Sequence, residues 1–211
     1  FAGSPRLWAR KEYDQLAVDQ FLDLIKINNL GPVFIHALYL VNLASEKTDL
    51  LDKSINALVM DLANGTKIKS SGVIVHIGSH LGLGFDAVKD RVVDSIKSVL
   101  SKTADCDLLL ENDAGQNGKI GSFEELSFLI SKVGDPRVKV CLDTAHMFAE
   151  GVDLRSSEEV DKLVETLIKL NIKDKIKCLH LNDSASELGS HRDIHANLGE
   201  GKIGLKGLAN L

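Results

Sequence analysis

Short apolar segments alternate along this chain with longer segments in which apolar residues recur every three or four positions. Each short segment ends in His, Glu or Asp, and runs of this length between turn residues predict buried β-strands. The expected strands are residues 33–36, 73–76, 108–111, 138–143 and 176–180. In the last of them, Cys178, Leu179 and Leu181 predict a buried strand.

The longer segments carry the apolar stripe of amphipathic helices. Such stripes predict helices over residues 14–27, 49–62 and 85–100, the second of which should stop near Gly65. Two further helices are predicted by capping boxes, in which a Ser side chain and the Glu side chain three positions later satisfy the first free amides of a helix. The two pairs are Ser122 with Glu125 and Ser156 with Glu159.

Alternation of strand and helix indicates a parallel sheet whose strands are joined by crossover helices. No Gly-x-Gly-x-x-Gly follows the first strand, which favours the (β/α)8 TIM barrel of the α/β class over a dinucleotide-binding fold. Phe1 looks like the tail of a strand, and Leu211 falls within the helix expected after the last strand. We therefore expect one TIM-barrel domain over residues 1–211 that lacks about one βα unit at each end.

The polar ends of the predicted strands are candidates for a functional site, because the loops that follow barrel strands line the active-site face. A single histidine at a strand end is more often structural, with a hydrogen bond to nearby backbone. Five ionisable ends are harder to explain in that way, since no Lys or Arg stands at these ends and buried unpaired charge is costly. A metal cluster is the simpler interpretation, and its members would be His36, His76, Glu111, Asp143 and His180.

Three more side chains that bind metals lie close to these strand ends in the sequence. His146 follows Asp143 by one helical turn, and Asp193 and His195 stand in a glycine-rich loop after the last strand. Neutral imidazoles supplemented by carboxylates are typical zinc ligands. The sequence therefore predicts a zinc-type site that also includes His146, Asp193 and His195.

The composition of the chain limits the cellular compartment and the classes of partner that are expected. The chain is 44% hydrophobic and contains no apolar run of membrane length, so no membrane partner is expected. Its formal charge of −5 speaks against a generally basic nucleic-acid binder. Three divalent cations would add roughly +6 and bring the total to about +1, which is compatible with a polyanionic substrate. The odd number of cysteines, three, fits a reducing intracellular compartment.

The residues around each strand end form longer motifs. They are, in chain order, residues 36–43 (His-Ala-Leu-Tyr-Leu-Val-Asn-Leu), 76–81 (His-Ile-Gly-Ser-His-Leu), 111–116 (Glu-Asn-Asp-Ala-Gly-Gln), 143–151 (Asp-Thr-Ala-His-Met-Phe-Ala-Glu-Gly) and 180–184 (His-Leu-Asn-Asp-Ser) with 199–201 (Gly-Glu-Gly). In ligand type, order and spacing these motifs resemble the endonuclease IV family of apurinic/apyrimidinic endonucleases, which is built on a xylose-isomerase-like TIM barrel.

The resemblance implies three Zn2+ ions at the mouth of the barrel, with Mn2+ as an alternative metal. Glu111 would bridge two of the ions, and it is the residue on which catalysis is expected to depend most. The implied ligand sets are His36 and His76 with Glu111, then Glu111 with Asp143 and His180, and finally His146 with Asp193 and His195.

The activity implied by the resemblance is hydrolysis of the phosphodiester 5′ to an abasic site in double-stranded DNA, as in base excision repair, to leave a 3′-hydroxyl. Neighbouring cations lower the pKa of a water molecule, so no protein nucleophile is needed. Turning the damaged nucleotide out of the helix costs least where the base is already lost. The enzyme is expected to act as a monomer inside the cell, in the cytoplasm (nucleoid) or the nucleus.

Candidate DNA contacts are fewer. Tyr39, just beyond a strand end, could enter the groove or stack at the lesion, and Arg6 and Trp8 lie in another expected loop of the active face. Packing of Tyr39 and Trp8 against helices is the alternative. Ile194 stands where the family commonly has arginine, and Arg192 is the residue that could replace that phosphate contact.

Two other functions are compatible with these patterns. A sugar isomerase or epimerase on a related barrel needs one or two divalent ions, and a truncated barrel could bind DNA or a partner without catalysis. The pair of Asp143 and His146, together with Asp193 and His195, adds a third metal position. That position favours the nuclease.

Overall fold

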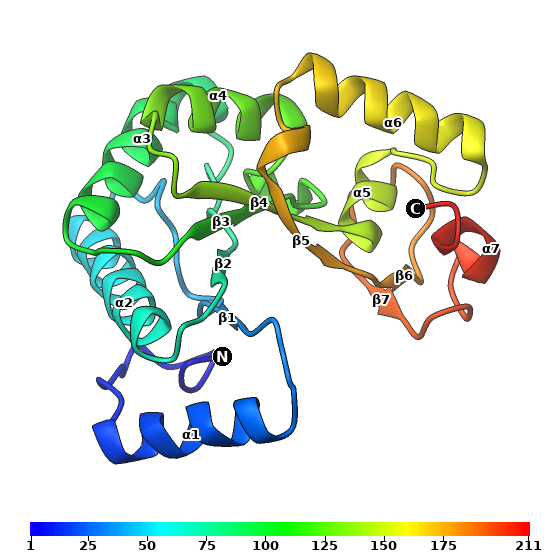
Figure 1. The fold of residues 1–211 in the computed structure, drawn as a ribbon. Coiled ribbons are helices and arrows are strands. Elements are labelled where there is room, and N and C mark those ends of the chain that lie inside the picture. The colour runs from blue at the N-terminus through cyan, green and yellow to red at the C-terminus, as the bar shows by residue number, and fades with distance from the viewer.

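Five parallel strands form the centre of the computed structural model, which describes residues 1–211 (Figure 1). The strands lie side by side in chain order within one curled sheet, and helices cover its outer side. Consecutive parallel strands joined by external helices are the repeating unit of a TIM barrel, so the predicted fold class is confirmed for these units. The strands are β1 (Phe34–His36), β2 (Gly72–Val75), β3 (Leu108–Glu111), β4 (Val138–Asp143) and β5 (Ile176–His180).

The predicted helices are all present, and two of them begin at the expected serines. Ser122 Oγ accepts a hydrogen bond from the Glu125 amide, and the Glu125 side chain accepts one from the Ser122 amide, which completes a capping box. The helices are α1 (Gln15–Ile27), α2 (Thr48–Lys67), α3 (Phe85–Ser101), α4 (Phe123–Val133), α5 (Thr144–Glu150), α6 (Ser157–Lys169) and α7 (Gly204–Leu208). Two 3-10 turns, at Gln116–Gly118 and Lys173–Lys175, complete the connections.

Apolar residues cover both faces of the sheet. The larger cluster joins the stripes of α2, α3 and α4 to the outer face. A smaller cluster lies on the concave face, and it consists of Ile74, Leu109 and Cys141 with Phe34 and Cys178 packed against them. Because strand side chains alternate between the two faces, these five residues, one from each strand, form a single layer inside the barrel. We call this the inner apolar layer.

α2 ends at Lys67, two residues past Gly65, near which the sequence predicted its end. A Cβ atom at position 65 would lie 2.7 Å from the Sγ atom of Cys106. Glycine at this position therefore allows the helix to approach Cys106 closely, and it does not end the helix. The end of β2 also differs slightly, since the strand stops at Val75 and His76 lies one residue beyond it.

Two further expectations need correction. The last strand, β5, is less buried than predicted, because it is an edge strand that pairs only with β4: Leu179 is 44% exposed, and Leu181, just after the strand, is 42% exposed. The second capping box is half formed. Ser156 Oγ accepts from the Glu159 amide, but the Glu159 carboxylate lies 2.8 Å from Lys162 Nζ instead of reaching back to the cap. No helix in the structure combines the length and the apolar character needed to cross a membrane.

Candidate metal centre

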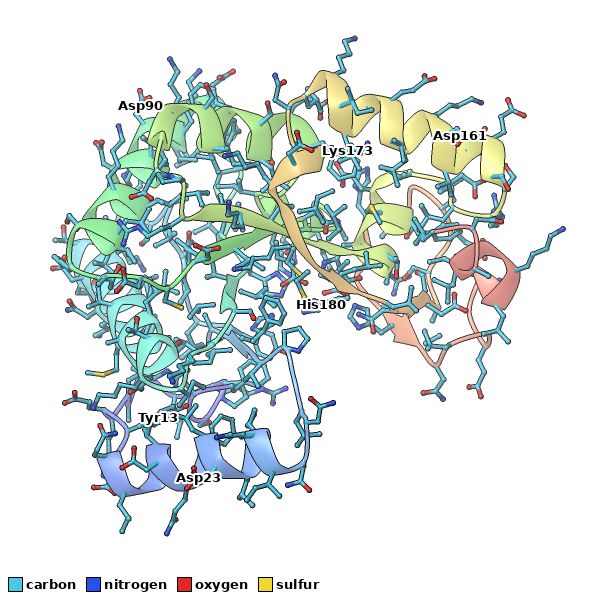
Figure 2. The ribbon with its side chains drawn as sticks, viewed as in Figure 1. Tyr13, Asp23, Asp90, Asp161, Lys173 and His180 are labelled. Carbon is cyan, nitrogen blue, oxygen red and sulfur yellow. The ribbon has the colours of Figure 1, made fainter.

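The predicted ligands at the strand ends form a ring on the concave face of the sheet. Each stands two positions after a member of the inner apolar layer, and the period of two keeps both residues on the same face. The ring therefore lies one layer above those apolar side chains, and Figure 2 labels one member, His180, at the end of β5. A hollow of about 440 Å³ is lined by all eight predicted ligands: His36, His76, Glu111, Asp143, His146, His180, Asp193 and His195.

Glu111 stands at the centre of the ring and is 1% exposed. Its two carboxylate oxygens face different neighbours. Oε2 lies 3.2 Å from His36 Nε2 and 3.6 Å from His76 Nε2, whereas Oε1 lies 2.7 Å from His180 Nδ1. A carboxylate with one oxygen toward each of two ligand groups is arranged to bridge two cations.

Asp143 is held in place by the start of α5, which follows β4 without a loop. Its Oδ1 atom accepts hydrogen bonds from the amides of Ala145 and His146, at 2.8 and 3.1 Å, and so caps the helix. Its Oδ2 atom accepts from Asn182 Nδ2 at 2.6 Å and lies 3.7 Å from His180 Nδ1. The capping bonds hold Oδ1, while Oδ2 faces the ring, so Asp143 is a rigidly held candidate ligand.

A third group of ligands forms where α5 meets the loop after β5. Asp193 Oδ1 lies 3.3 Å from His146 Nε2 and 3.2 Å from His195 Nε2. His195 Nε2 also lies 3.9 Å from Asp143 Oδ2. Asp143 therefore stands beside this third group as well as beside Glu111 and His180. The resemblance to the family did not assign Asp143 to the third set.

The loop that carries Asp193 and His195 is fixed by Asp183, a residue to which the sequence had given no role. A short antiparallel pair, β6 (Asp183–Ser184) with β7 (His195–Ala196), joins the two ends of the loop. The fully buried Asp183 carboxylate accepts hydrogen bonds from five backbone amides, those of Ser184, Gly199, Gly201, Ile203 and Gly204. The signal in the sequence was an aspartate followed by a run of glycines, whose amides can approach one carboxylate closely.

The histidine rings are oriented by contacts outside the ring of ligands. His36 Nδ1 lies 2.7 Å from the Ala37 carbonyl oxygen and His146 Nδ1 lies 2.9 Å from that of Asn112, which leaves Nε2 of each ring for the hollow. His76 Nδ1 lies 3.2 Å from Asp113 Oδ2. A metal-binding histidine typically donates its second N–H to a carbonyl or a carboxylate in this way.

Lys119 is a second residue that sequence reasoning missed. Its Nζ atom lies 3.2 Å from Asp113 Oδ2 and 3.9 Å from Asp193 Oδ2. No basic residue stands at the strand ends themselves, but Lys119 reaches them from the loop after β3. The rim thus carries one ammonium group between the first and third ligand groups.

Several ionisable groups of the centre have shifted pKa values. Burial alone would raise the pKa of Glu111, but hydrogen bonds from His180 and His36 outweigh burial and lower it. Burial alone would lower the pKa of His146, but Asp193, Asp143 and Glu111 raise it to about 9. The pKa values of His180 and His195 are raised as well, so without cations protons on these three imidazoles would balance part of the carboxylate charge. Metal ions can replace those protons, so metal loading should weaken as the pH falls.

The donor atoms fit metal ions in type and in spacing. Nitrogen and oxygen ligands about 2.0–2.2 Å from a tetrahedral zinc ion lie about 3.4 Å from one another. Within each of three sets, the donor atoms lie within 4.8 Å of one another. These sets are His36, His76 and Glu111, then Glu111, Asp143 and His180, and finally Asp143, His146 and His195.

Three of the four residues predicted to contact DNA lie at or beside the rim of the hollow. The Tyr39 side chain is 54% exposed, and its ring centroid lies 5.7 Å from that of His36. The Tyr39 amide donates to the Pro5 carbonyl at 3.0 Å, which brings the exposed Arg6 next to it. Arg192 is exposed and directly precedes the predicted ligand Asp193. Trp8, in contrast, packs against the hydrophobic core and lines a separate hollow over α2 with Arg10 and Met60.

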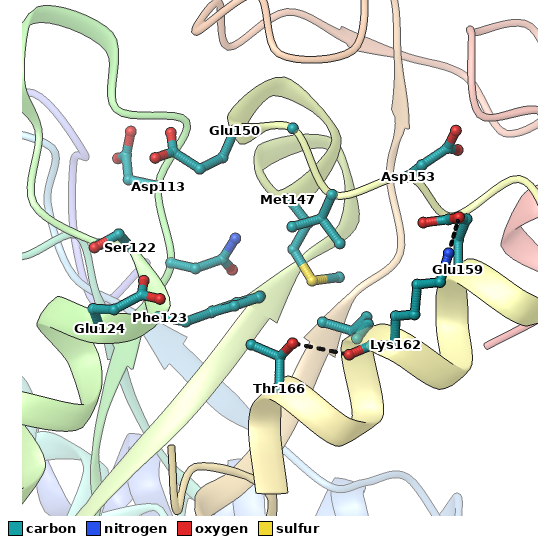
Figure 3. Close-up of a pocket in the computed structure, with 15 residues that line it drawn as sticks. Asp113, Ser122, Phe123, Glu124, Met147, Glu150, Asp153, Glu159, Lys162 and Thr166 are labelled. Carbon is teal, nitrogen blue, oxygen red and sulfur yellow. Dashed lines mark hydrogen bonds and ion pairs between the residues drawn. The ribbon is translucent and has the colours of Figure 1, made fainter. Parts of the chain in front are cut away.

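Another hollow, of about 380 Å³, lies between α4, α5 and α6 (Figure 3). Figure 3 shows the side chains of Asp113 and Glu150 together at one end of it, and Phe123 and Thr166 at the other. No histidine lines this hollow, and its lysine, Lys162, is already paired with Glu159. It therefore lacks the mixed donor set of the metal centre.

Comparison with known proteins agrees with the geometry of the centre. The model of the family described as "xylose isomerase-like TIM barrel" matches residues 1–211. Proteins named "Probable endonuclease 4" from Halothermothrix orenii and Haloarcula marismortui are 40% and 37% identical to this chain, over 100% and 99% of it and over 77% and 75% of their own lengths.

Solved structures show the same relationship. The crystal structure of endonuclease IV from Thermus thermophilus superimposes with a TM-score of 0.87 at 36% identity, covering 99% of this chain and 74% of that one. A D-tagatose 3-epimerase-like protein has a TM-score of 0.66 at 20% identity, over 93% and 71% of the two chains, which shows a shared fold alone. Both the matching family model and these levels of identity place the chain in the endonuclease IV group of the xylose isomerase-like TIM barrel family.

Proposed function

We propose that this centre, loaded with zinc, hydrolyses the phosphodiester on the 5′ side of abasic sites in double-stranded DNA and leaves a 3′-hydroxyl. The chain is a DNA-cleaving hydrolase of the endonuclease IV type. The observation that carries the proposal is the third ligand group. His146, Asp193 and His195 meet beside the two groups that share Glu111, which is one group more than a sugar isomerase requires.

Three zinc ions are the proposed complement, with Mn2+ as an alternative metal. His36 and His76 would hold one ion together with Glu111, and Glu111 would share a second with Asp143 and His180. When bound, the ions supply a water molecule of lowered pKa and positive charge around the phosphate. The support for this number is that the three sets share Glu111 and Asp143, so neighbouring ions would lie close together.

The residues of the chain position the ions and the substrate without attacking it. The lining of the hollow contains no Ser, Thr or Cys, and its carboxylates and imidazoles are the proposed metal ligands, so water is the nucleophile proposed. Glu111 and Asp143 are each 1% exposed and are held by several contacts, which keeps the centre rigid while the substrate binds.

Substrate contacts are proposed for the residues at the rim. The exposed Tyr39 ring stands beside His36 and His76, where it can fill the gap left by a missing base and stack on a neighbouring base. Arg6 follows Pro5, whose carbonyl binds the Tyr39 amide, and Arg192 precedes Asp193; both arginines are exposed and can contact DNA phosphates. The DNA contact predicted for Trp8 remains a prediction, as does the monomeric state.

A sugar isomerase or epimerase is the second candidate, and the shared fold with the epimerase-like structure favours keeping it in the test. Such an enzyme would need only the two ligand groups that share Glu111, and the group of His146, Asp193 and His195 would have no role in its reaction. An enzyme of that class would bind metal fully and leave an abasic duplex intact.

The experiment compares Glu111→Gln with a matched control, Glu124→Gln, on a duplex that contains one abasic site. Glu124 is exposed on α4 and outside the ring. We expect Glu111→Gln to lower kcat by more than roughly 100-fold, which exceeds the usual effect of losing an outer contact to a metal ligand, and to lower the bound metal. Glu124→Gln should behave as the parent protein. Wild-type turnover in Glu111→Gln would contradict the proposal.

A further inference from the structure

Two cysteines lie directly beneath the metal centre. Cys141 on β4 and Cys178 on β5 are partners in the register of the two parallel strands. Both belong to the inner apolar layer, on the concave face of the sheet. Each stands two positions before a ligand of the ring, Asp143 and His180 respectively, so the two thiols lie one layer below those ligands.

The thiols and one ring nitrogen make a compact set of donors. The Sγ atoms of Cys141 and Cys178 and a nitrogen of His180 all lie within 4.8 Å of one another. Cys141 is fully buried, whereas Cys178 is partly exposed. Neither cysteine lines the hollow that holds the eight predicted ligands.

We propose that Cys141, Cys178 and His180 form an additional site for a thiophilic cation, of the class of Cd2+ or Cu+, which shares His180 with one of the three ligand groups of the ring. Thiolates prefer soft cations, while the carboxylate-rich ring suits zinc and harder ions. As the cation binds, each thiol releases its proton to solvent and forms one bond from sulfur to the metal. With a divalent cation the two thiolate charges cancel the charge of the ion, which limits the cost of burying it.

The shared histidine gives this site a consequence for the ring. His180 also belongs to the set it forms with Glu111 and Asp143, where its Nδ1 atom lies 2.7 Å from Glu111 Oε1. A cation held by the two thiols competes with that set for the same imidazole. The site is therefore inhibitory, and it makes the centre sensitive to thiophilic metals.

The test is a titration of the full chain with Cd2+ in the presence of a reductant that contains no thiol. Binding is monitored by the ultraviolet charge-transfer absorption of cadmium thiolates. The parent protein, loaded with zinc beforehand so that the ring is occupied, should develop this absorption and saturate it at one thiolate-bound equivalent. Cys178→Ser should lose it, and Cys178→Ala provides a second variant in case the first is poorly folded. Cys106→Ser is the matched control, because Cys106 is a buried cysteine that packs against α2, away from the ring.

The outcomes separate this inference from the proposed function. Absorption that persists unchanged in both Cys178 variants, or that disappears equally in Cys106→Ser, overturns the thiol site. Incision of the abasic duplex is measured in parallel, as the ratio of rates with and without Cd2+ for each protein, and inhibition should be lost in the Cys178 variants. If the parent protein shows the absorption but never cleaves DNA, the thiol site stands and the proposed function fails.

Discussion

Asp183→Asn is the substitution that most directly tests how the third ligand group is held. It keeps the size of the side chain and replaces one acceptor oxygen by an NH2 group that can only donate. In the structure, Oδ2 of Asp183 accepts from the amides of Gly199 and Gly201 at 3.0 and 3.1 Å, and Oδ1 accepts from Ser184 and Ile203 at 2.8 and 3.0 Å. Whichever way the new amide turns, two backbone donors lose their acceptor.

The size of the effect follows from that count. A hydrogen bond to a charged group contributes about 1.5–3 kcal/mol, so the loss of two should lower the free energy of unfolding by about 3–6 kcal/mol. This is a large part of the roughly 5–15 kcal/mol that a typical protein has. Because the same amides shape the loop that carries Asp193 and His195, the variant should also bind less metal in the third group.

Urea unfolding monitored by circular dichroism, with metal content measured in parallel, checks both expectations. The control is Asp161→Asn, since Asp161 is exposed on α6, as labelled in Figure 2, and outside the centre. Burial alone would raise the pKa of Asp183, but its backbone donors lower it, so its contribution to stability is present above the unfolded pKa and is lost in acid. The stability gap between parent and Asp183→Asn should therefore narrow as the pH falls. Equal urea midpoints for Asp183→Asn and Asp161→Asn at neutral pH would refute the reasoning.

Three further changes have defined outcomes. Replacing His195, whose side chain is 43% exposed, by Ala should remove about one equivalent of metal while the circular dichroism spectrum stays that of the parent; full metal content in the variant would count against the third group. Asp61 is buried 3.1 Å from Arg10, and burial outweighs Arg10 to raise the pKa of Asp61 to about 6. The folded protein therefore holds the proton on Asp61 more tightly than the unfolded chain does. As the pH rises from about 4 to above 6, the free energy of unfolding should fall by about 3 kcal/mol through this group alone. Asp61→Asn should abolish that part of the pH dependence. Ser122→Ala should lower the free energy of unfolding by about 1 kcal/mol, because both bonds of its capping box are present, and an unchanged Tm would contradict this.

The sequence by itself determined the order of the elements and the members of the ring. A period of two places His180 above Cys178 on one face of a strand, and a period near 3.6 sets the buried face of each helix. Both patterns are local, so they can be read without knowing which segments meet. Parallel strands then place their carboxyl ends at a single edge, which is why residues as distant as His36 and His180 could be assigned to one site.

Only the tertiary structure decided what depends on contacts between distant segments. It showed that Asp183 gathers the amides of a loop, that Lys119 reaches Asp113 and that Trp8 packs against the core. It also showed that Gly65 serves a close approach to Cys106, where the local pattern had suggested a helix end. Each of these depends on which atoms lie within a few ångströms after folding, and no periodicity along the chain encodes such distances.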